Sequence, residues 1–447
     1  MSSLKKQAFR ATAWTIVGFG SSMVLRFASN LILARLLLPE SFGLMALVNV
    51  FIMGLHLFSD VGLGPSIIQN KRGDDPTFIN TAWTIQAIRG VALWLGCILI
   101  AWPVSLLYGE KQLLYLIPVV GLSTLISSMD STALFTLNRQ LAVGKLAIFE
   151  LGGQIIGLVA MIIWAWFDRS VWALVFGGIV AALVQLVWSH RLLPEQPNRF
   201  AWDKEAAKSI FSFGKWIFFS TALTFLASQS DRLILGKLVS PATLGIYGIA
   251  YTLADLPRSV ILSLSGKVIF PAFSKLADLP REAFRAKILK NRRLLLLALA
   301  PGLTILVSFG DFAVRLLYKE VYHDAAWMLP IIAVGIWHTS LYSTMSPALM
   351  ALGKPIYNTL GYLLTLITLS TALLVGYHFM GIKGAVIAVA VGDIPFYCVT
   401  MYGLWREKLG CFKQDLWATA LFLGLLTAVL FGRYVVTGTL PISPILQ

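Results

Sequence analysis

The amino-acid sequence predicts an all-α polytopic integral membrane protein, and three observations lead to this prediction. Of the 447 residues, 57% are hydrophobic and only 13% are charged, whereas a soluble domain carries roughly 25% charged residues. Apolar runs of about 20 residues, enough to cross a bilayer as a helix, recur along the chain. The runs are continuously apolar, as in LLLLALAPGLTILVSF, and lack the alternation of a β-barrel. Because lipid cannot satisfy backbone amides, these spans are helices.

We expect thirteen spans, within a range of about 12–14 transmembrane helices. They cover residues 13–37, 42–67, 79–107, 113–137, 143–167, 170–193, 209–238, 242–271, 293–317, 326–351, 356–380, 382–405 and 416–436. The predicted organisation is an N-terminal six-helix lobe (1–193), a cytoplasmic linker (194–208), a C-terminal six-helix lobe (209–405) and an extra helix with a tail (406–447). The basic segment 274–292 is expected to lie on the membrane surface, with its apolar residues facing the interface.

The distribution of Lys and Arg among the loops predicts the orientation. With a cytoplasmic N-terminus, the inside segments hold 22 of the 36 Lys and Arg residues, and the outside segments hold eight, Arg433 among them. The net charge of +15 is then explained by loops that face an anionic leaflet of membrane lipids. No nucleic acid is needed as a partner.

The chain contains an internal repeat with an offset of 202 residues. LILARLLLPESFG at 31–43 aligns without a gap on LILGKLVSPATLG at 233–245. Beyond the aliphatic residues, the alignment matches Arg35 with Lys237, Pro39 with Pro241, Gly43 with Gly245 and, upstream, Trp14 with Trp216. Six spans separate the copies, so the repeat predicts two parallel six-helix lobes around a central cavity. We expect the prolines to end or redirect a helix and the glycines to allow a tight external turn.

Two parts of the sequence resemble a known family. The basic residue, proline and Phe-Gly or Leu-Gly that follow each LIL run, with SDVGLGPSIIQ at 59–69 and DRLILGKLVSPATLGIYGIAYTL at 231–253, carry the resemblance. They resemble the oligosaccharide flippase (Wzx-type polysaccharide transporter) family of the multidrug/oligosaccharidyl-lipid/polysaccharide exporter superfamily. The resemblance implies a transporter of the bacterial inner membrane whose substrate is a polyprenyl-diphosphate-linked oligosaccharide. It also implies a polysaccharide polymerase and a chain-length regulator as candidate partners.

Charged residues within the expected spans are the candidates for a functional site. Each costs about 2.5–3.5 kcal/mol at mid-helix on insertion scales, so it must face a hydrated cavity, pair with an opposite charge or reach the interface. The basic residues are Arg26, Arg89, Lys215, Arg232, Arg258 and Lys267. The acidic residues within or beside the spans are Asp60, Asp130, Glu150, Asp231, Asp255 and Asp393.

Arg26 lies in the middle of the first span, with Ser22 and Asn30 one turn away on the same face. We interpret this polar stripe as a substrate-binding surface, and an internal pair of Arg26 with Asp60 is the alternative. Arg89 is a further candidate for the same cavity.

Arg258 shares a helix face with Asp255, so anion binding and a local ion pair both remain open. The helices that carry Arg26 and Arg258 also resemble those of lipid-linked peptidoglycan-precursor flippases, where span arginines engage the substrate diphosphate. The resemblance therefore implies a diphosphate-binding role for both arginines.

His56 and Asp60 are four residues apart and share a helix face. A titratable pair within a membrane suits proton or cation coupling, and a structural network is the alternative. Asp255 belongs to the same class of candidates.

The sequence favours a flippase over two rivals. A multidrug cation antiporter predicts an acidic, aromatic cavity, whereas the charged residues within these spans are at least as basic as acidic. A membrane polymerase or glycosyltransferase would need a large external loop or a soluble domain, and neither is present in the sequence. No HExxH, paired CxxC or phosphate-binding loop occurs, so we expect neither enzymatic catalysis nor a metal or other cofactor.

Overall fold

The structure, a computed structural model, describes residues 3–442 except 60–61, 71, 141 and 195–196. Within these residues the regular secondary structure is helical and contains no strand. The chain divides into two compact units, Met1–Ala222 and Leu223–Gln447.

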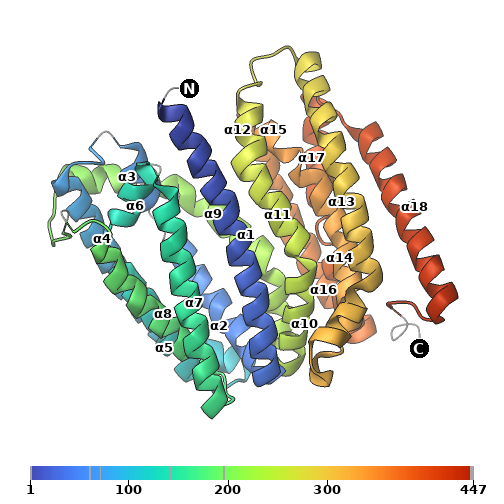
Figure 1. Cartoon of the computed structure of the whole chain (residues 1–447), viewed down its shortest axis with the longest axis horizontal. Helices are drawn as coiled ribbons and strands as arrows, with labels where there is room; N and C mark the ends of the chain where they lie inside the picture. The colour runs from blue at the N-terminus through green and yellow to red at the C-terminus, as the bar shows by residue number, and fades with distance from the viewer. Residues whose placement is uncertain (1–2, 60–61, 71, 141, 195–196, 443–447) are drawn as a thin grey trace. The chain divides into compact units, whose positions relative to one another are not determined.

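Most of the first unit is formed by eight helices (Figure 1). They are α1 (Ser3–Leu36), α2 (Pro39–Phe58), α3 (Leu63–Gln69), α4 (Pro76–Tyr108), α5 (Leu113–Ser128), α6 (Ala133–Arg139), α7 (Val143–Phe167) and α8 (Trp172–Arg191). The long helix α9 (Lys204–Leu238) begins in this unit and ends in the second.

The second unit contains helices of very different lengths. They are α10 (Pro241–Ala254), α11 (Leu256–Leu264), the π-helix η1 (Ser265–Ile269), α12 (Phe270–Ser274), α13 (Arg281–Leu317), the 3-10 helix η2 (Glu320–Tyr322), α14 (Ala325–Ser343), α15 (Ser346–Ala351), α16 (Ile356–Val391), α17 (Ile394–Arg406) and α18 (Phe412–Thr437). The turn η1 lies between α11 and α12 and joins them into a segment of continuous helical structure.

Ten helical segments of the described residues are long and apolar enough to cross a membrane, or eleven if the bent pair α5 and α6 forms one span. One segment, Ile356–Arg406, has 51 residues and would be about 75 Å long as a straight helix, against roughly 30 Å of bilayer hydrocarbon. It therefore crosses twice and turns at Gly381, whose φ of 58° favours glycine. With this second crossing the described residues contain eleven such spans, or twelve if α5 and α6 form one, against the thirteen expected within a range of 12–14. The predicted all-α polytopic class is confirmed.

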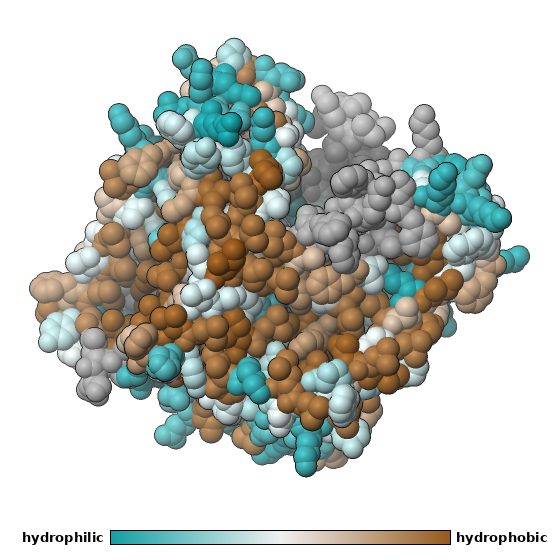
Figure 2. Space-filling view, turned by 180° about the vertical axis from the view of Figure 1, so that it is seen from behind, coloured by the Kyte–Doolittle hydropathy of each residue, from teal (hydrophilic) through white to brown (hydrophobic). Residues whose placement is uncertain are grey.

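The surface has the apolar character that a membrane requires. Figure 2 shows hydrophobic residues across the middle of the visible face and hydrophilic residues gathered toward its upper and lower edges. Large apolar side chains such as Leu99, Phe167, Phe379 and Val436 are exposed. In water such a surface would aggregate, whereas in lipid it is stable.

The two copies of the repeat begin their second helices at equivalent residues. Pro39 is the first residue of α2 and Pro241 is the first residue of α10, each after an extended residue. Proline suits this position because a backbone N–H in the first turn of a helix makes no hydrogen bond within the helix, so its absence costs nothing. Gly43 and Gly245 are buried inside these helices, so the expectation that they form the turn was wrong.

The basic segment 274–292 was expected on the membrane surface, and this expectation was wrong. Residues from Arg281 onward are the first turns of α13, a helix of 37 residues. Phe284 and Ile288 are buried in a cluster with Leu349 and Leu404, and the remaining apolar residues of the segment, Leu276, Leu279 and Leu289, pack against it. The apolar face therefore meets protein instead of lipid, which the amphipathic pattern alone does not distinguish.

The predicted linker is attached to the side of α4. The backbone N–H groups of Arg199, Ala201 and Asp203 donate to the side chains of Asn80, Thr84 and Thr81, respectively, each over 3.0 Å. Arg72 lies 2.8 Å from the carboxylates of both Asp75 and Asp203, and its hydrogen bonds lower the pKa of the two carboxyl groups. These groups therefore stay ionised at neutral pH and hold the segment in place.

Two buried ion pairs join α18 to α13. Arg292 Nη1 lies 2.5 Å from Asp415 Oδ1, and both side chains are only 2% exposed. About five turns further along, Arg433 Nη2 lies 2.6 Å from Asp311 Oδ2. From the first pair to the second, the residue number increases on both helices. The two helices therefore run side by side in the same direction (Figure 1). Arg433 thus lies near the C-terminal end of α18, and its assignment to the external side stays a prediction.

The pair between Arg292 and Asp415 predicts a strong stability effect. Arg292→Met leaves the Asp415 carboxylate buried without its counter-charge and should lower the free energy of unfolding by about 3–5 kcal/mol. Thermal unfolding of the purified protein in detergent measures the loss. The double variant Arg292→Met/Asp415→Leu should recover most of it, because no lone charge remains. Lys287→Met, at an exposed position of the same helix, is the matched control and should change stability by less than about 0.5 kcal/mol. An equal loss in the control would contradict the role of the pair.

Candidate functional site

Arg26 lies halfway along the apolar segment Val17–Leu36 of α1. Its side chain is exposed on the first unit, and no hydrogen bond or ion pair joins it to another described residue. Its alternative partner, Asp60, lies outside the described residues. Arg26 is therefore a cation in the middle of a span, and no described residue of the first unit neutralises its charge.

The other members of the predicted stripe differ from Arg26. Ser22 donates to Gln154 Oε1 on α7 over 3.0 Å, so its hydroxyl is used within the unit. Asn30 is half-buried and interacts with other groups. Substrate binding by Arg26 and Asn30 stays a prediction.

Arg89 binds the end of α2. Its Nε donates to Ser59 Oγ over 2.9 Å, and its Nη2 donates to the carbonyl oxygen of His56 over 2.8 Å. A cation at these last carbonyls also complements the negative end of the helix dipole. Arg89 thus joins α4 to α2, which gives it a structural role whether or not it binds substrate.

His56 faces this arginine. Its Nδ1 lies 3.3 Å from Arg89 Nη2 and accepts there, because a guanidinium can only donate. Asp60, its predicted partner in ion coupling, lies outside the described residues. The coupling role of His56 and Asp60 therefore remains a prediction.

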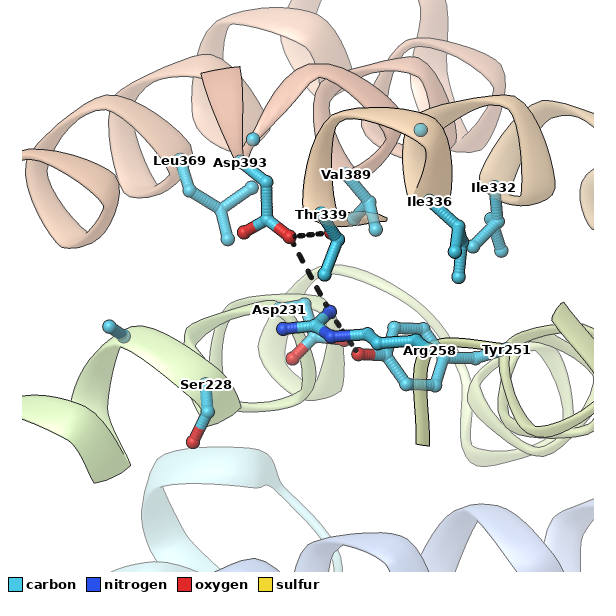
Figure 3. Close-up of a pocket in the computed structure, with 13 residues that line it drawn as sticks. Ser228, Asp231, Tyr251, Arg258, Ile332, Ile336, Thr339, Leu369, Val389 and Asp393 are labelled. Carbon is cyan, nitrogen blue, oxygen red and sulfur yellow. Dashed lines mark hydrogen bonds and ion pairs between the residues drawn. The ribbon is translucent and has the colours of Figure 1, made fainter. Parts of the chain in front are cut away.

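The second unit contains a pocket with ionised side chains, and Arg258 lies within it. Figure 3 shows the Arg258 guanidinium extending from the side of Asp231 and Tyr251 toward Thr339 and Asp393 on the opposite wall. The polar lining residues come from α9, α10, α11, α14 and the α16–α17 junction: Ser228, Asp231, Tyr251, Arg258, Thr339 and Asp393. Five segments of the chain therefore converge on this pocket.

Arg258 is held between two carboxylates. Its Nε lies 3.8 Å from Asp255 Oδ1, and its Nη1 lies 3.7 Å from Asp393 Oδ2. Nη1 also donates to the Tyr251 hydroxyl over 3.3 Å. The local pair with Asp255 that the sequence left open is therefore present, and Asp393 adds a partner from another helix.

Asp393 is fixed by α14 as well as by Arg258. The Thr339 hydroxyl donates to Asp393 Oδ2, and the Tyr342 hydroxyl donates to the same oxygen over 3.4 Å. Asp393 precedes the first turn of α17, where a negative charge also complements the helix dipole. These contacts join the α16–α17 junction to α14.

A second arginine lies beside this group. Arg232 Nη1 donates to Gln229 Oε1 over 2.9 Å, and its guanidinium carbon lies 5.2 Å from the centre of the Tyr251 ring. The neighbouring Asp231 accepts a 2.6 Å hydrogen bond from the Tyr247 hydroxyl. Two arginines and three aspartates thus share the region, so its formal charge is one negative unit.

The free volume of the pocket limits what can bind to Arg258 in this conformation. The cavity measures about 50 Å³, which is space for a few water molecules at most. A sugar diphosphate needs a far larger site, since pockets for small ligands typically measure about 300–1,000 Å³. Arg258 is therefore an internal ion-pair partner in the described state, and a substrate could reach it only after the pocket opens.

Several of these contacts were missed in the sequence. Tyr251 lies four residues before Asp255 and seven before Arg258, so it shares their helix face and could have been predicted to join their pair. Thr339 and Tyr342 carry no comparable signal, because polar residues of this kind are common in helices. Asp311 and Asp415 lie inside or beside expected spans and were overlooked as partners for buried arginines.

An all-helical chain with many membrane crossings and buried ionised groups has the architecture of a membrane transporter, and solved transporters share the fold. The structure described as lipid II flippase MurJ in an inward closed conformation superposes with a TM-score of 0.72, at 13% identity, over 96% of this chain and 93% of that one. An inward-facing multidrug resistance MATE transporter of the MOP superfamily gives a TM-score of 0.65, at 14% identity, over 86% and 94% of the two chains. At these identities the likeness concerns the fold alone.

The chain belongs to the family described as polysaccharide biosynthesis protein, whose model matches residues 32–327. Among curated relatives, the succinoglycan biosynthesis transport protein ExoT of Rhizobium meliloti (strain 1021) is 25% identical over 350 residues. The match covers 78% of this chain and 70% of that protein. The family resemblance predicted from the sequence is confirmed.

The pair between Arg258 and Asp393 predicts an energetic coupling between these residues. Asp393→Asn keeps the size of the side chain but removes its charge, and Arg258→Gln removes the opposite charge. Each single variant should lower thermal stability, because the remaining charge loses a partner. In a double-mutant cycle in detergent, the coupling energy should be about 0.5–3 kcal/mol. Strictly additive effects would contradict an internal pair.

Proposed function

We propose that the protein is a flippase that moves polyprenyl-diphosphate-linked oligosaccharide across the cytoplasmic membrane, by alternating access, for the synthesis of a surface polysaccharide. Such a polysaccharide could be an O-antigen, a capsule or an exopolysaccharide. The observation that carries the proposal is family membership together with a curated relative named as a succinoglycan biosynthesis transport protein. The fold it shares with a lipid II flippase supports a lipid-linked substrate.

The position of Arg26 supports this assignment. A diphosphate is a compact anion, and an arginine fork can bind its oxygens with two hydrogen bonds at once. Arg26 supplies such a fork at mid-span with no described partner. Asn30 offers an amide for the glycan, and Arg258 becomes available once Asp393 and Asp255 release it.

The proposal includes a location and an orientation. We place the protein in the inner membrane with its N-terminus in the cytoplasm, on the basis of its loop charges. Because α18 runs parallel to α13, the C-terminus would then lie on the external side. Polysaccharide polymerase and chain-length regulator are the partners proposed for the next steps, since they would use the translocated glycan.

Deletion of the gene tests the function. Cells that lack the protein should accumulate a polyprenyl-linked oligosaccharide whose glycan remains on the cytoplasmic side, and they should lose the surface polymer. Mass spectrometry of extracted lipids, with a sidedness assay on membrane vesicles, measures both effects. If lipid-linked sugars and surface polysaccharide were unchanged while resistance to cationic drugs fell, the flippase proposal would fail in favour of a multidrug transporter.

Substitution of Arg26 tests the proposed site. Arg26→Ala should reduce complementation of the deletion strain by at least about 100-fold, because loss of a charge-assisted bidentate contact costs several kcal/mol. Membrane insertion and detergent stability should stay close to wild type, since no described contact is removed.

Arg315→Ala, which changes an exposed arginine in the last turn of α13, is the matched control and should complement fully. Arg26→Lys keeps the charge and should restore part of the activity. Full transport by Arg26→Ala would remove this residue from the site.

A further inference from the structure

Three cationic side chains are carried by α13 and α18 close to the hydrogen bond between Leu289 and Gln414. Lys290 and Arg293 are three residues apart on α13, and Lys413 is in the first turn of α18. All three are exposed. Among the described residues, no carboxylate pairs with any of them.

Two contacts bring these two helix faces together. Gln414 Nε2 donates to the Leu289 carbonyl oxygen over 2.8 Å, which places Lys290 and Lys413 at the same level. One turn further along, the guanidinium carbon of Arg293 lies 5.3 Å from the centre of the Trp417 ring. Arg293 therefore lies against Trp417, and Lys290 and Lys413 precede these two residues by one turn on the same helix faces.

The nearby acids are already engaged. Asp415 accepts from Arg292 and from the Tyr397 hydroxyl, the latter over 3.0 Å. Glu407 lies within 4.0 Å of both Arg281 and Lys354. The three cations thus form a positive site that the described protein does not neutralise.

This positive site lies at the boundary of an apolar layer. After Arg293 the next charged residue of α13 is Asp311, and after Asp415 the next charged residue of α18 is Arg433. The uncharged stretches 294–310 and 416–432 are each about 25 Å long, close to the thickness of bilayer hydrocarbon. Leu294 and Leu416, directly beyond the cations, are 75% and 62% exposed.

We propose that this surface of α13 and α18 binds an anionic phospholipid, with its phosphate among Lys290, Arg293 and Lys413 and its acyl chains along Leu294 and Leu416. Three donors around one phosphate supply charge-assisted hydrogen bonds, and Trp417 has the interfacial position that tryptophan favours. Basic pockets between membrane helices bind lipid headgroups by this chemistry. The exposed leucines distinguish the proposed occupant from an acidic peptide or a free anion, neither of which would cover an apolar surface in the bilayer.

The test uses the full-length protein purified in neutral detergent and two lipids that differ in headgroup charge. Phosphatidylglycerol should raise the melting temperature in a saturable way, and phosphatidylcholine should have a much smaller effect. In Lys290→Gln/Arg293→Gln/Lys413→Gln, the lipid concentration for half the effect should rise at least about tenfold, because each cation near a headgroup contributes to binding. The matched control Arg199→Gln/Lys204→Gln/Lys208→Gln removes the same charge from exposed positions of the first unit and should respond as wild type.

Several results would overturn the proposal. They are an equal response to phosphatidylcholine, an unchanged response in the triple variant, and an equal loss in the control variant. Inorganic phosphate that reproduced the full shift would show a simple anion site, and an acidic peptide that did so would show a protein-docking surface. If the triple variant did not fold, Arg293→Gln alone should still weaken the response to phosphatidylglycerol, and an unchanged response would count against the lipid.

Discussion

The requirement that a charge within a bilayer be compensated locally determines much of the second unit. Arg292 and Asp415 meet near one membrane boundary, and Arg433 and Asp311 meet near the other. Neither partner of a pair could remain in a low-dielectric interior without the other. The two pairs therefore define the direction of α18 and its position along α13. These paired charges thus contribute to how α18 packs against α13.

The sequence predicts the spans well because hydrocarbon imposes a simple rule on every residue of a helix. The predicted span 143–167 coincides with α7, and Pro39 and Pro241, expected to end or redirect a helix, are the first residues of α2 and α10. Segments at the membrane boundary follow no such rule. The segment 274–292 has one apolar and one basic face, which suits either a lipid interface or a protein cluster. Only its tertiary contacts with residues such as Leu349 and Leu404 distinguish the two.

The candidate site was less predictable than the spans. A charged residue in a span indicates that a counter-charge is required, but the sequence does not show which residue supplies it. Arg258 could be recognised as exceptional, and Asp255 lies on the same face only three residues away. Asp393, more than 130 residues later, is brought to it by the packing of α14 and the α16–α17 junction. Arg89 likewise finds its acceptors at the end of α2, where backbone carbonyls leave no signal in the sequence.

These differences give the two arginines of the proposed substrate path distinct energetics. Arg26 can bind an anion without giving up a described partner, whereas Arg258 must first leave Asp393, Asp255 and Tyr251. The affinity of a ligand for Arg258 is reduced by the free energy of opening this pocket. A diphosphate bound to Arg258 therefore stabilises the open state of the pocket. In that state Arg258 no longer pairs with Asp393, the residue that joins the α16–α17 junction to α14. Binding of the anion would thus be coupled to rearrangement of the helices, and nothing beyond the exchange of one counter-charge for another is needed.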